Sequence, residues 1–252
     1  MKKAGWEPAS SHGWEWNNMD VVLGKVKGEA GVIFFDAAGT LIRLARPVGW
    51  HYAQIARKYG LEADEARMES AFRDVWRSRP SRSPSRGPRH QDDRPWWREL
   101  ALDVLHTASP TAAQIDESAW FDELYAHFAE PGVWVLYDDA LRCLDRLAGR
   151  FRLAVISNFD RRLQRVLEDL GVAARFERLI ISSEVGCEKP DPGIFQRALD
   201  MMDVAAECCL HAGDDPERDW AGAAAAGIAV FRVQRPRVTL DDLMVQPATE
   251  AY

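Results

Sequence analysis

Apolar positions follow one period in the first part of this chain and another in the second. Residues 31–35, Gly-Val-Ile-Phe-Phe, form an almost continuous apolar run, which predicts a strand buried on both faces. From residue 47 to about 131 the apolar residues recur at helical spacing instead. This pattern predicts helices over 50–59, 63–77, 96–106 and 111–128, with no strand among them.

From residue 132 onward, apolar strands and amphipathic helices alternate. Strands are expected over 151–156, 179–181, 208–211 and 228–233. Helices are expected over 138–147, 161–170, 192–202 and 216–226. Such alternation is typical of right-handed crossovers in a parallel sheet. The strand at 31–35 needs the same sheet to bury both of its faces, so the helical block interrupts one domain.

The sequence therefore predicts an α/β fold in which an all-α cap is inserted into a parallel-sheet core. The expected core comprises residues 31–46 and 132–252, and the expected cap comprises residues 47–131. Residues 1–30, with Trp6, Trp14 and Trp16 among polar residues, are interpreted as an N-terminal extension outside the core.

Composition limits the kinds of partner that the protein can bind and the cell compartment in which we expect it. The 252 residues are 47% hydrophobic, enough for a full core and a second small domain. No apolar run reaches the roughly 20 residues of a membrane helix, and the N-terminus lacks the apolar segment of a signal peptide. A net charge of −7 disfavours nucleic acid as a partner. The 4 cysteines show no zinc or disulfide spacing, so we expect a soluble cytoplasmic protein.

Chemically active residues follow four of the expected strands. The first strand ends in Asp36, and the second ends in Ser157 and Asn158. Lys189 follows the third strand, and Asp214 and Asp219 follow the fourth. Because the carboxyl ends of parallel strands meet at one edge of a sheet, these side chains are expected to converge. Each has a simpler interpretation as a cap or a surface charge, but the four together favour a shared site.

The expected combination of groups suits phosphoryl transfer. Converging carboxylates repel one another, which favours a hard divalent cation held by oxygen, most plausibly Mg²⁺. A carboxylate nucleophile, a hydroxyl and a lysine then supply the positioning and charge neutralisation that in-line attack on phosphorus requires.

These motifs resemble those of the haloacid dehalogenase superfamily, in the branch with a helical cap inserted after the first motif and a Rossmann-like core. The resemblance covers about residues 31–233. It rests on four motifs in order, namely Asp36-Ala37-Ala38-Gly39-Thr40, Ser157-Asn158, Lys189-Pro190, and Gly213-Asp214-Asp215 with Asp219.

The resemblance implies a role for each matched residue. Asp36 would be the nucleophile that becomes an aspartyl-phosphate, Ser157 would hydrogen-bond the phosphoryl oxygens, and Lys189 would neutralise their charge. Thr40 and Asn158 would contact the substrate, a small phosphorylated metabolite. Magnesium would be held by Asp36, the backbone carbonyl of Ala38 and Asp214, with Asp219 as a second or outer ligand.

Ala38 departs from the family pattern. Phosphatases of this superfamily usually carry a second aspartate at this position as general acid and base, a role worth roughly 10²- to 10⁴-fold in rate. The backbone carbonyl survives the change, so the sequence predicts a metal site with impaired proton transfer. A catalytically weak or inactive protein that binds a phosphorylated ligand or a protein partner is the alternative.

Other relatives without that aspartate fit less well. Haloacid dehalogenases use tyrosine there and need no metal, whereas this chain keeps Asp214 and Asp219. Phosphonoacetaldehyde hydrolases have alanine there but need a cap lysine, and Lys58 is the only lysine in the cap. Phosphoryl-transfer pumps use threonine there and span a membrane. The cap side chains available to replace the missing acid are His51, His90, Asp92 and Asp93.

The cap also carries a cluster of arginines. The functional interpretation is a lid that recruits an anionic substrate through bidentate contacts. For the Ser-Pro-Arg stretch at residues 78–89, a solvated and partly disordered loop is favoured. Residues 92–97 are the better candidate for closing over the site. The arginines are Arg77, Arg79, Arg82, Arg86, Arg89, Arg94 and Arg98.

Overall fold

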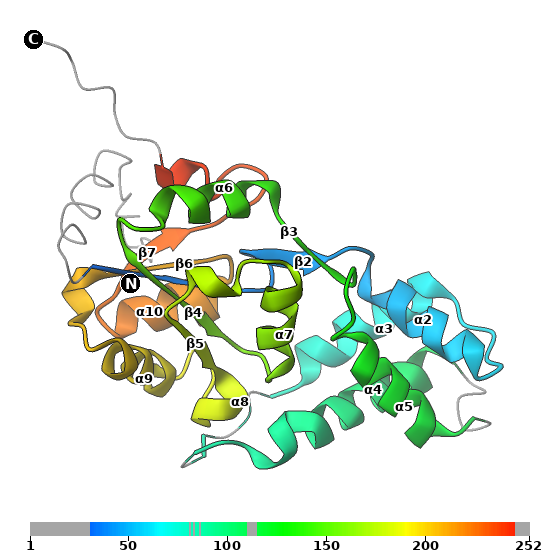
Figure 1. The fold of residues 1–252 in the computed structure, drawn as a ribbon. Coiled ribbons are helices and arrows are strands. Elements are labelled where there is room, and N and C mark those ends of the chain that lie inside the picture. The colour runs from blue at the N-terminus through cyan, green and yellow to red at the C-terminus, as the bar shows by residue number, and fades with distance from the viewer. Residues whose placement is uncertain (1–30, 81, 83, 86, 110–114, 245–252) are drawn as a thin grey trace, which may run out of the picture.

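The computed structural model describes residues 31–80, 82, 84–85, 87–109 and 115–244, so the expected extension at 1–30 lies outside the described residues. Five parallel strands form a sheet in the order β5-β4-β1-β6-β7 (Figure 1). They span Val32–Phe35 (β1), Arg152–Ser157 (β4), Arg178–Ile181 (β5), Cys209–Gly213 (β6) and Ala229–Arg232 (β7). The predicted α/β class with a parallel sheet is confirmed.

β1 lies at the centre of the sheet, where its apolar residues are buried on both faces. Each of its four residues is fully buried. Phe35 pairs with Val155 of β4 and with Ala212 of β6. This register brings the residues that follow the three strands to one edge of the sheet.

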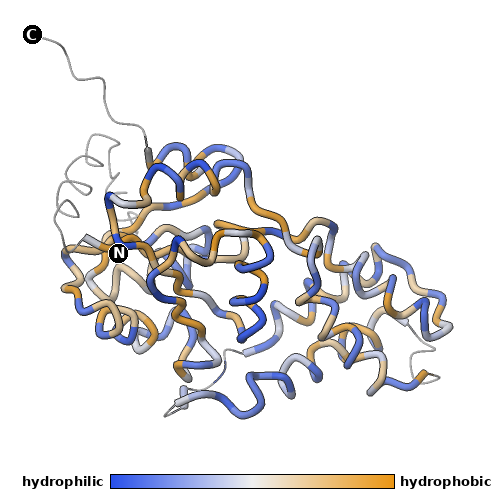
Figure 2. Tube along the Cα trace, in the orientation of Figure 1, coloured by the Kyte–Doolittle hydropathy of each residue, from blue (hydrophilic) through white to orange (hydrophobic). Residues whose placement is uncertain are grey.

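Helices cover both faces of the sheet. The helices α6 (Asp138–Leu147) and α7 (Arg162–Asp169) pack on one face, with the short helix η7 (Asp242–Met244) beside them. The helices α9 (Pro192–Met202) and α10 (Gly222–Ala225) pack on the other face. Hydrophobic residues run along the strands, whereas the helices alternate between hydrophobic and hydrophilic residues, as Figure 2 shows. The core is therefore a three-layer α/β/α arrangement.

A small antiparallel ribbon joins the core to the inserted helices. β2 (Ile42–Leu44) pairs with β3 (Trp134–Leu136), and Leu44 lies opposite Trp134. This ribbon is not predicted from the sequence, because three-residue strands are too short to show a period of two. Its position means that the chain leaves the core and returns to it at neighbouring points.

Among the residues that the structure describes, the inserted segment contains helices joined by loops and no strand. It contains α2 (Val48–Lys58), α3 (Glu65–Ser78), α4 (Arg94–Ala108) and α5 (Glu117–His127). Asp64 caps α3 by accepting from the backbone N–H of Arg67, and Asp116 caps α5 in the same way. These helices share a hydrophobic cluster of their own, built around the fully buried Trp120. None of the described helices has the length and hydrophobicity to cross a membrane.

The stretch between α3 and α4 is a loop, as expected, and several of its described residues are exposed. Others contact the core, so the expectation of a solvated loop holds only in part. The backbone N–H of Ser85 donates to the carbonyl of Gly186, and that of Arg89 donates to the carbonyl of Ser183. Gly186 ends the short helix α8 (Ser182–Val185), and the one-turn helix η2 (His90–Asp93) follows the stretch. Arg86 lies outside the described residues.

Side-chain ion pairs explain why this arginine-rich stretch is held in place. Arg82 donates from its backbone N–H to Glu188 at 2.6 Å, and its guanidinium pairs with Asp93 at 2.8 Å. Arg89 pairs with the same Asp93 carboxylate at 3.0 Å. All four side chains are largely buried, so we call this group the strap cluster. The sequence did not reveal this cluster, because one of its two acids, Glu188, lies 106 positions from Arg82.

The helix expected at 216–226 has an unexpected first half. Residues Pro216–Ala221 form the wide-turn helix η6, of the π type, and only Gly222–Ala225 are α-helical. The one-turn helices η4 (Ala173–Arg175) and η5 (Ala206–Cys208) complete the core. π-type turns occur often at functional sites, and η6 directly follows Asp214 and Asp215.

Candidate active site

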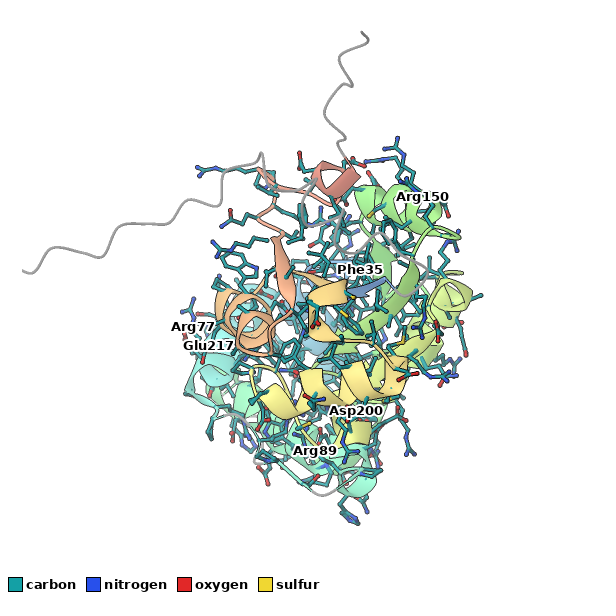
Figure 3. The ribbon with its side chains drawn as sticks, turned by 90° about the vertical axis from the view of Figure 1, so that its left-hand side faces the viewer. Phe35, Arg77, Arg89, Arg150, Asp200 and Glu217 are labelled. Atoms are coloured by element: carbon teal, nitrogen blue, oxygen red, sulfur yellow. The ribbon has the colours of Figure 1, made fainter. Side chains whose placement is uncertain are left out.

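A buried chain of charged groups lies at the edge of the sheet where β1 and β6 end. The ammonium of Lys189 lies 2.6 Å from Oδ1 of Asp36 and 2.6 Å from Oδ1 of Asp219. Lys189 is 2% exposed, so this cation is screened very little by water. Figure 3 labels Phe35, the residue before Asp36, in the interior of the molecule. The expected convergence of Asp36, Lys189 and Asp219 is thus observed.

Asp214 joins this group through the turn after β1. Gly39 has a φ of +101°, and a Cβ at this position would lie 2.4 Å from Oδ2 of Asp214. Only glycine fits so tight an approach with that backbone conformation. The next residue, Thr40, donates from its hydroxyl to Oδ1 of Asp214 at 3.0 Å. The turn thus holds Asp214 beside Asp36.

These carboxylates can hold a metal ion. One oxygen from each of Asp36, Asp214 and Asp219 lies within 4.8 Å of the others. Three carboxylates face one ammonium, and this excess of negative charge with hard oxygen donors fits Mg²⁺. Both oxygens of Asp219 already accept hydrogen bonds, from Lys189 and from the backbone N–H of Asp215. The carbonyl of Ala38 accepts no hydrogen bond from any described residue and is available as a further donor.

Burial and neighbouring charges shift the pKa values of these side chains in different directions. Burial raises the pKa of Asp36 to about 7, although Lys189 limits the rise. Burial also raises the pKa of Asp214. For Asp219 burial acts in the same direction, but Lys189 and His211 outweigh it and hold the pKa below its usual range. Burial works against the charge of Lys189, yet Asp36 and Asp219 raise its pKa above the ordinary value. A second cation beside Asp36 would favour its ionised form.

The end of β4 supplies a hydroxyl and an amide with different surroundings. Ser157 is 2% exposed, and its hydroxyl makes no hydrogen bond with the described residues. Asn158 donates to the carbonyl of Lys189 at 2.8 Å and accepts from its N–H at 2.7 Å. The amide therefore fixes the backbone of Lys189. Substrate contact by Asn158 and by Thr40 stays a prediction, since the polar groups of both side chains are engaged within the protein.

The structure adds His211, which the sequence analysis had missed. It is fully buried on β6, and its Nε2 lies 2.9 Å from Oδ1 of Asp219. Burial lowers the pKa of His211. An ionised carboxylate can only accept, so Nε2 of the ring donates to Asp219. The available signal was a single histidine inside the apolar run Cys209–Gly213.

Arg235 is a second residue that the sequence analysis had missed. Its Nη2 donates to the carbonyl of Thr40 at 2.8 Å, and its Nη1 donates to Asp139 at 2.8 Å. The guanidinium also lies 3.8 Å from the centre of the Tyr137 ring. No local pattern marks it, because the residues it contacts are far away in the sequence.

The cap residues considered as replacements for the missing acid either form contacts away from the site or are exposed. His51 contacts His127, and Asp92 accepts from Ser183 and from the backbone of Arg161. Asp93 belongs to the strap cluster, and His90 is exposed. Lys58, considered for Schiff-base chemistry, forms an exposed pair with Glu123. Ala38 itself is exposed, so water reaches this position.

Comparison with known proteins decides the family. A family profile described as haloacid dehalogenase-like hydrolase matches residues 31–227. The chain belongs to this family. It is 37% identical to the mouse haloacid dehalogenase-like hydrolase domain-containing protein 3 over 205 residues, which are 80% of this chain and 81% of the mouse protein. The human protein of the same name is 36% identical over 208 residues, covering 82% of each chain.

Solved structures of this family share the fold. A HAD phosphatase from Thermococcus onnurineus superposes with a TM-score of 0.58 at 21% identity, over 82% of this chain and 87% of that chain. An L-2-haloacid dehalogenase from Xanthobacter autotrophicus, with chloropropionic acid covalently bound, gives a TM-score of 0.60 at 22% identity, over 81% and 78% of the two chains. Both chemistries therefore occur on this architecture, and the residues of the site must distinguish them.

Proposed function

We propose that this haloacid dehalogenase-like hydrolase is a cytoplasmic, magnesium-dependent phosphatase that hydrolyses a small phosphorylated metabolite through Asp36. The observation that carries the proposal is the group of Asp36, Asp214 and Asp219, with the ammonium of Lys189 bound to two of them, Asp36 and Asp219. Dehalogenation would not use so many carboxylates, since a halide leaves without a metal. Phosphoryl transfer does require fixed positive charge and metal-binding oxygens.

In the first proposed step, an oxygen of Asp36 forms a bond to phosphorus. The bond between phosphorus and the substrate alcohol oxygen breaks, and that oxygen keeps the electron pair. Lys189 neutralises the phosphoryl charge, and the free hydroxyl of Ser157 donates to a phosphoryl oxygen. Magnesium, held by Asp36, Asp214 and the carbonyl of Ala38, would supply further positive charge beside the phosphoryl group.

In the second step, water attacks phosphorus and the bond from phosphorus to Asp36 breaks. The electron pair returns to the carboxylate, and phosphate leaves. Two protons must move in the cycle: one to the departing alcohol and one from the attacking water. The methyl group of Ala38 can carry neither, so the proposal assigns both transfers to water at this exposed position. Turnover should then be slower than with a positioned carboxylate.

Ala38 also favours a second candidate function, that of a catalytically weak or inactive protein that binds a phosphorylated ligand or a protein partner. The metal-binding groups and Lys189 would then serve binding alone. The two candidates differ in whether any substrate is turned over in a way that depends on Asp36.

A screen of phosphate monoesters with and without Mg²⁺ tests the proposal. The wild type, Asp36→Asn and Ala38→Asp are compared. Turnover in the wild type that needs Mg²⁺ and disappears in Asp36→Asn is the expected result, with a rise of up to about 100-fold in Ala38→Asp. Activity confined to Ala38→Asp would favour the binding protein. Metal-independent release of halide from a 2-haloacid would contradict the proposal.

A further inference from the structure

Lys189 lies in a tight turn that links α8 to α9. The backbone N–H of Asp191 donates to the carbonyl of Glu188 at 2.8 Å, which closes the turn over the two residues between them. Asp191 then caps α9, since its side chain accepts from the backbone N–H of Gly193. The place of Lys189 therefore depends on how the two ends of this turn, Glu188 and Asp191, are held.

The first end of the turn is held by the inserted segment. Both carboxylate oxygens of Glu188 accept from Arg82, Oε1 from the backbone N–H at 2.6 Å and Oε2 from Nε at 2.5 Å. Nη1 of Arg89 also lies 3.8 Å from Oε2. Glu188 is 7% exposed, so water competes little for these contacts. The residue directly before Lys189 is thus fixed by arginines that belong to the cap.

The stretch between α3 and α4 also packs tightly on Gly186, two positions before Glu188. Gly186 has a φ of +83°, and a Cβ there would lie 2.3 Å from the carbonyl oxygen of Gly87. The carbonyl of Gly186 accepts from the backbone N–H of Ser85 at 2.7 Å. In Figure 1 this stretch passes beside α8, the helix that Gly186 ends. The segment that leads into the turn is therefore held by the cap at both Gly186 and Glu188.

The core holds the same turn from its other side. Asn158, at the end of β4, bonds to both the N–H and the carbonyl of Lys189. The ammonium at the end of this side chain lies 2.6 Å from Asp36 and 2.6 Å from Asp219 at once. Such a placement tolerates little movement of the turn, because a displacement of about 1 Å would lengthen one of the two contacts beyond hydrogen-bonding range.

We propose that Glu188 is a positioning residue that acts through Lys189. Glu188 of the core and Arg82 of the inserted segment together hold the turn, so docking of the cap helps to place the ammonium of Lys189. This inference rests on the proposed phosphatase function, in which Lys189 neutralises the phosphoryl charge. The inserted segment thereby contributes to the geometry of a site whose charged groups belong to the core.

Two charge changes of opposite sign test this role. Glu188→Gln removes a negative charge and Arg82→Met removes a positive one, so a purely electrostatic influence would change anion binding in opposite directions. Loss of positioning should weaken binding in both variants. With Mg²⁺ present, we expect the affinity for inorganic phosphate to fall by about tenfold in each, as measured by calorimetric titration. A rise in affinity in Glu188→Gln, or an unchanged affinity in both variants, would overturn the proposal.

The ion pair of Arg152 and Glu177 supplies matched controls for these charge changes. The pair lies at the start of β4, whereas Ser157 ends that strand at the site, and both side chains are partly exposed. Glu177→Gln and Arg152→Met should therefore leave the affinity for phosphate unchanged. Urea unfolding identifies any variant that is not folded, and affinities are compared among the folded ones. A fall in the controls as large as that in Glu188→Gln would overturn the proposal.

Gly186→Ala tests the same role without any change of charge. The added Cβ would meet the carbonyl of Gly87 and push the stretch between α3 and α4 away from the turn. We expect the affinity for phosphate to fall as it does in Glu188→Gln. Gly171→Ala is the matched control, because Gly171 has a φ of +71° but open space around its Cβ position. Equal affinities in these two glycine variants would contradict the proposal.

The ammonium of Lys189 provides a readout that needs neither phosphate nor turnover. Among the described residues the lysines are Lys58 and Lys189, and Lys58 is exposed. The protons of the buried ammonium are protected from water, so its signal can be followed in ¹H–¹⁵N NMR spectra. A change in global stability alone does not move this native-state signal. We expect it to shift in Glu188→Gln and in Gly186→Ala, but not in Gly171→Ala.

This readout separates the proposal from the phosphatase function. An unchanged ammonium signal in Glu188→Gln, with turnover that still depends on Asp36, would overturn the proposal and leave the phosphatase function standing. A shifted signal in a protein that hydrolyses no phosphate ester would support the positioning by Glu188 and contradict the phosphatase function.

Discussion

Arg235 donates a hydrogen bond from Nη2 to the carbonyl oxygen of Thr40 at 2.8 Å, across 195 positions of the chain. The hydroxyl of Thr40 donates in turn to Asp214 at 3.0 Å. The segment after β7 is thereby connected to a candidate metal ligand through one threonine. Asp139 fixes the other side of the guanidinium, so Arg235 has little freedom to move.

Replacing Arg235 should weaken metal binding. In Arg235→Met the carbonyl of Thr40 loses its partner, and the turn that holds Asp214 becomes less well fixed. We expect the affinity for Mg²⁺ to fall by about tenfold, roughly the worth of one charge-assisted hydrogen bond. Calorimetric titration with Mg²⁺ measures this directly. Arg232→Met, a change at an exposed arginine three positions earlier, should leave the affinity unchanged.

Replacing Lys189 should destabilise the protein far more than replacing an exposed lysine. Lys189→Met leaves Asp36 and Asp219 buried without their cation, which typically costs about 3 kcal/mol or more. Lys58→Met removes an exposed pair with Glu123 and should cost less than about 1 kcal/mol. Urea unfolding at pH 8 gives both values. Mg²⁺ should restore part of the loss in Lys189→Met, and addition of EDTA should remove that gain.

Replacing Arg82 should release the stretch between α3 and α4. In Arg82→Met, Glu188 and Asp93 lose the guanidinium between them, and Arg89 alone must neutralise both. Trypsin cleavage after Arg89, which is largely buried, should become about tenfold faster because local opening costs less. Arg77→Met at an exposed position of α3 is the control. Equal cleavage rates in wild type and Arg82→Met would show that the strap cluster does not hold this stretch.

His51 should make stability depend on pH in the acid range. Burial, and then the neighbouring His127, lower the pKa of His51 from an ordinary 6.5 to about 4 in the folded protein. The unfolded chain therefore takes up a proton first as the pH falls from 6.5 toward 4. Protonation favours the unfolded state over that interval, so stability declines there and the decline from this group ends below pH 4.

The measurement is urea unfolding at pH 7 and pH 4.5 for the wild type and His51→Asn, which keeps a polar group near the Nδ1 contact with His127. The loss of unfolding free energy between the two pH values should be smaller in His51→Asn by on the order of 2 kcal/mol. His106→Gln, a change at a half-exposed histidine beside Glu117, should leave the wild-type difference intact.

The convergence of the site was predictable because it follows from where strands end. Asp36, Ser157 and Asp214 each stand directly after an apolar run, and parallel pairing brings such positions to one edge. The sequence could not show how Asp219 is used, since both of its oxygens are engaged by groups that only the folded chain brings near.

The strap cluster shows why contacts between residues far apart in the sequence were not predicted. Its arginines lie in a stretch whose Ser, Pro and Arg content is typical of solvated loops, and composition was the only local signal. Of the two acids that Arg82 contacts, Asp93 is close in the sequence but Glu188 lies 106 positions away. Pairing over such distances depends on the docking of cap and core, which no local period reports. Arg235 contacts Thr40 and Asp139 within the core, and it was missed because both lie far from it in the sequence.

The ribbon of β2 and β3 has a consequence for how this architecture can vary. Leu44 and Trp134 lie opposite each other, and Ala45 donates to the carbonyl of Val133 just beyond them. Chain ends that are so close can be joined by an insertion of almost any length, or by a two-residue hairpin. One inserted domain can therefore be replaced by another without disturbing the strands of the core. A different insertion would change which molecules reach Asp36, while the strands that position Asp36, Ser157 and Asp214 would stay in place.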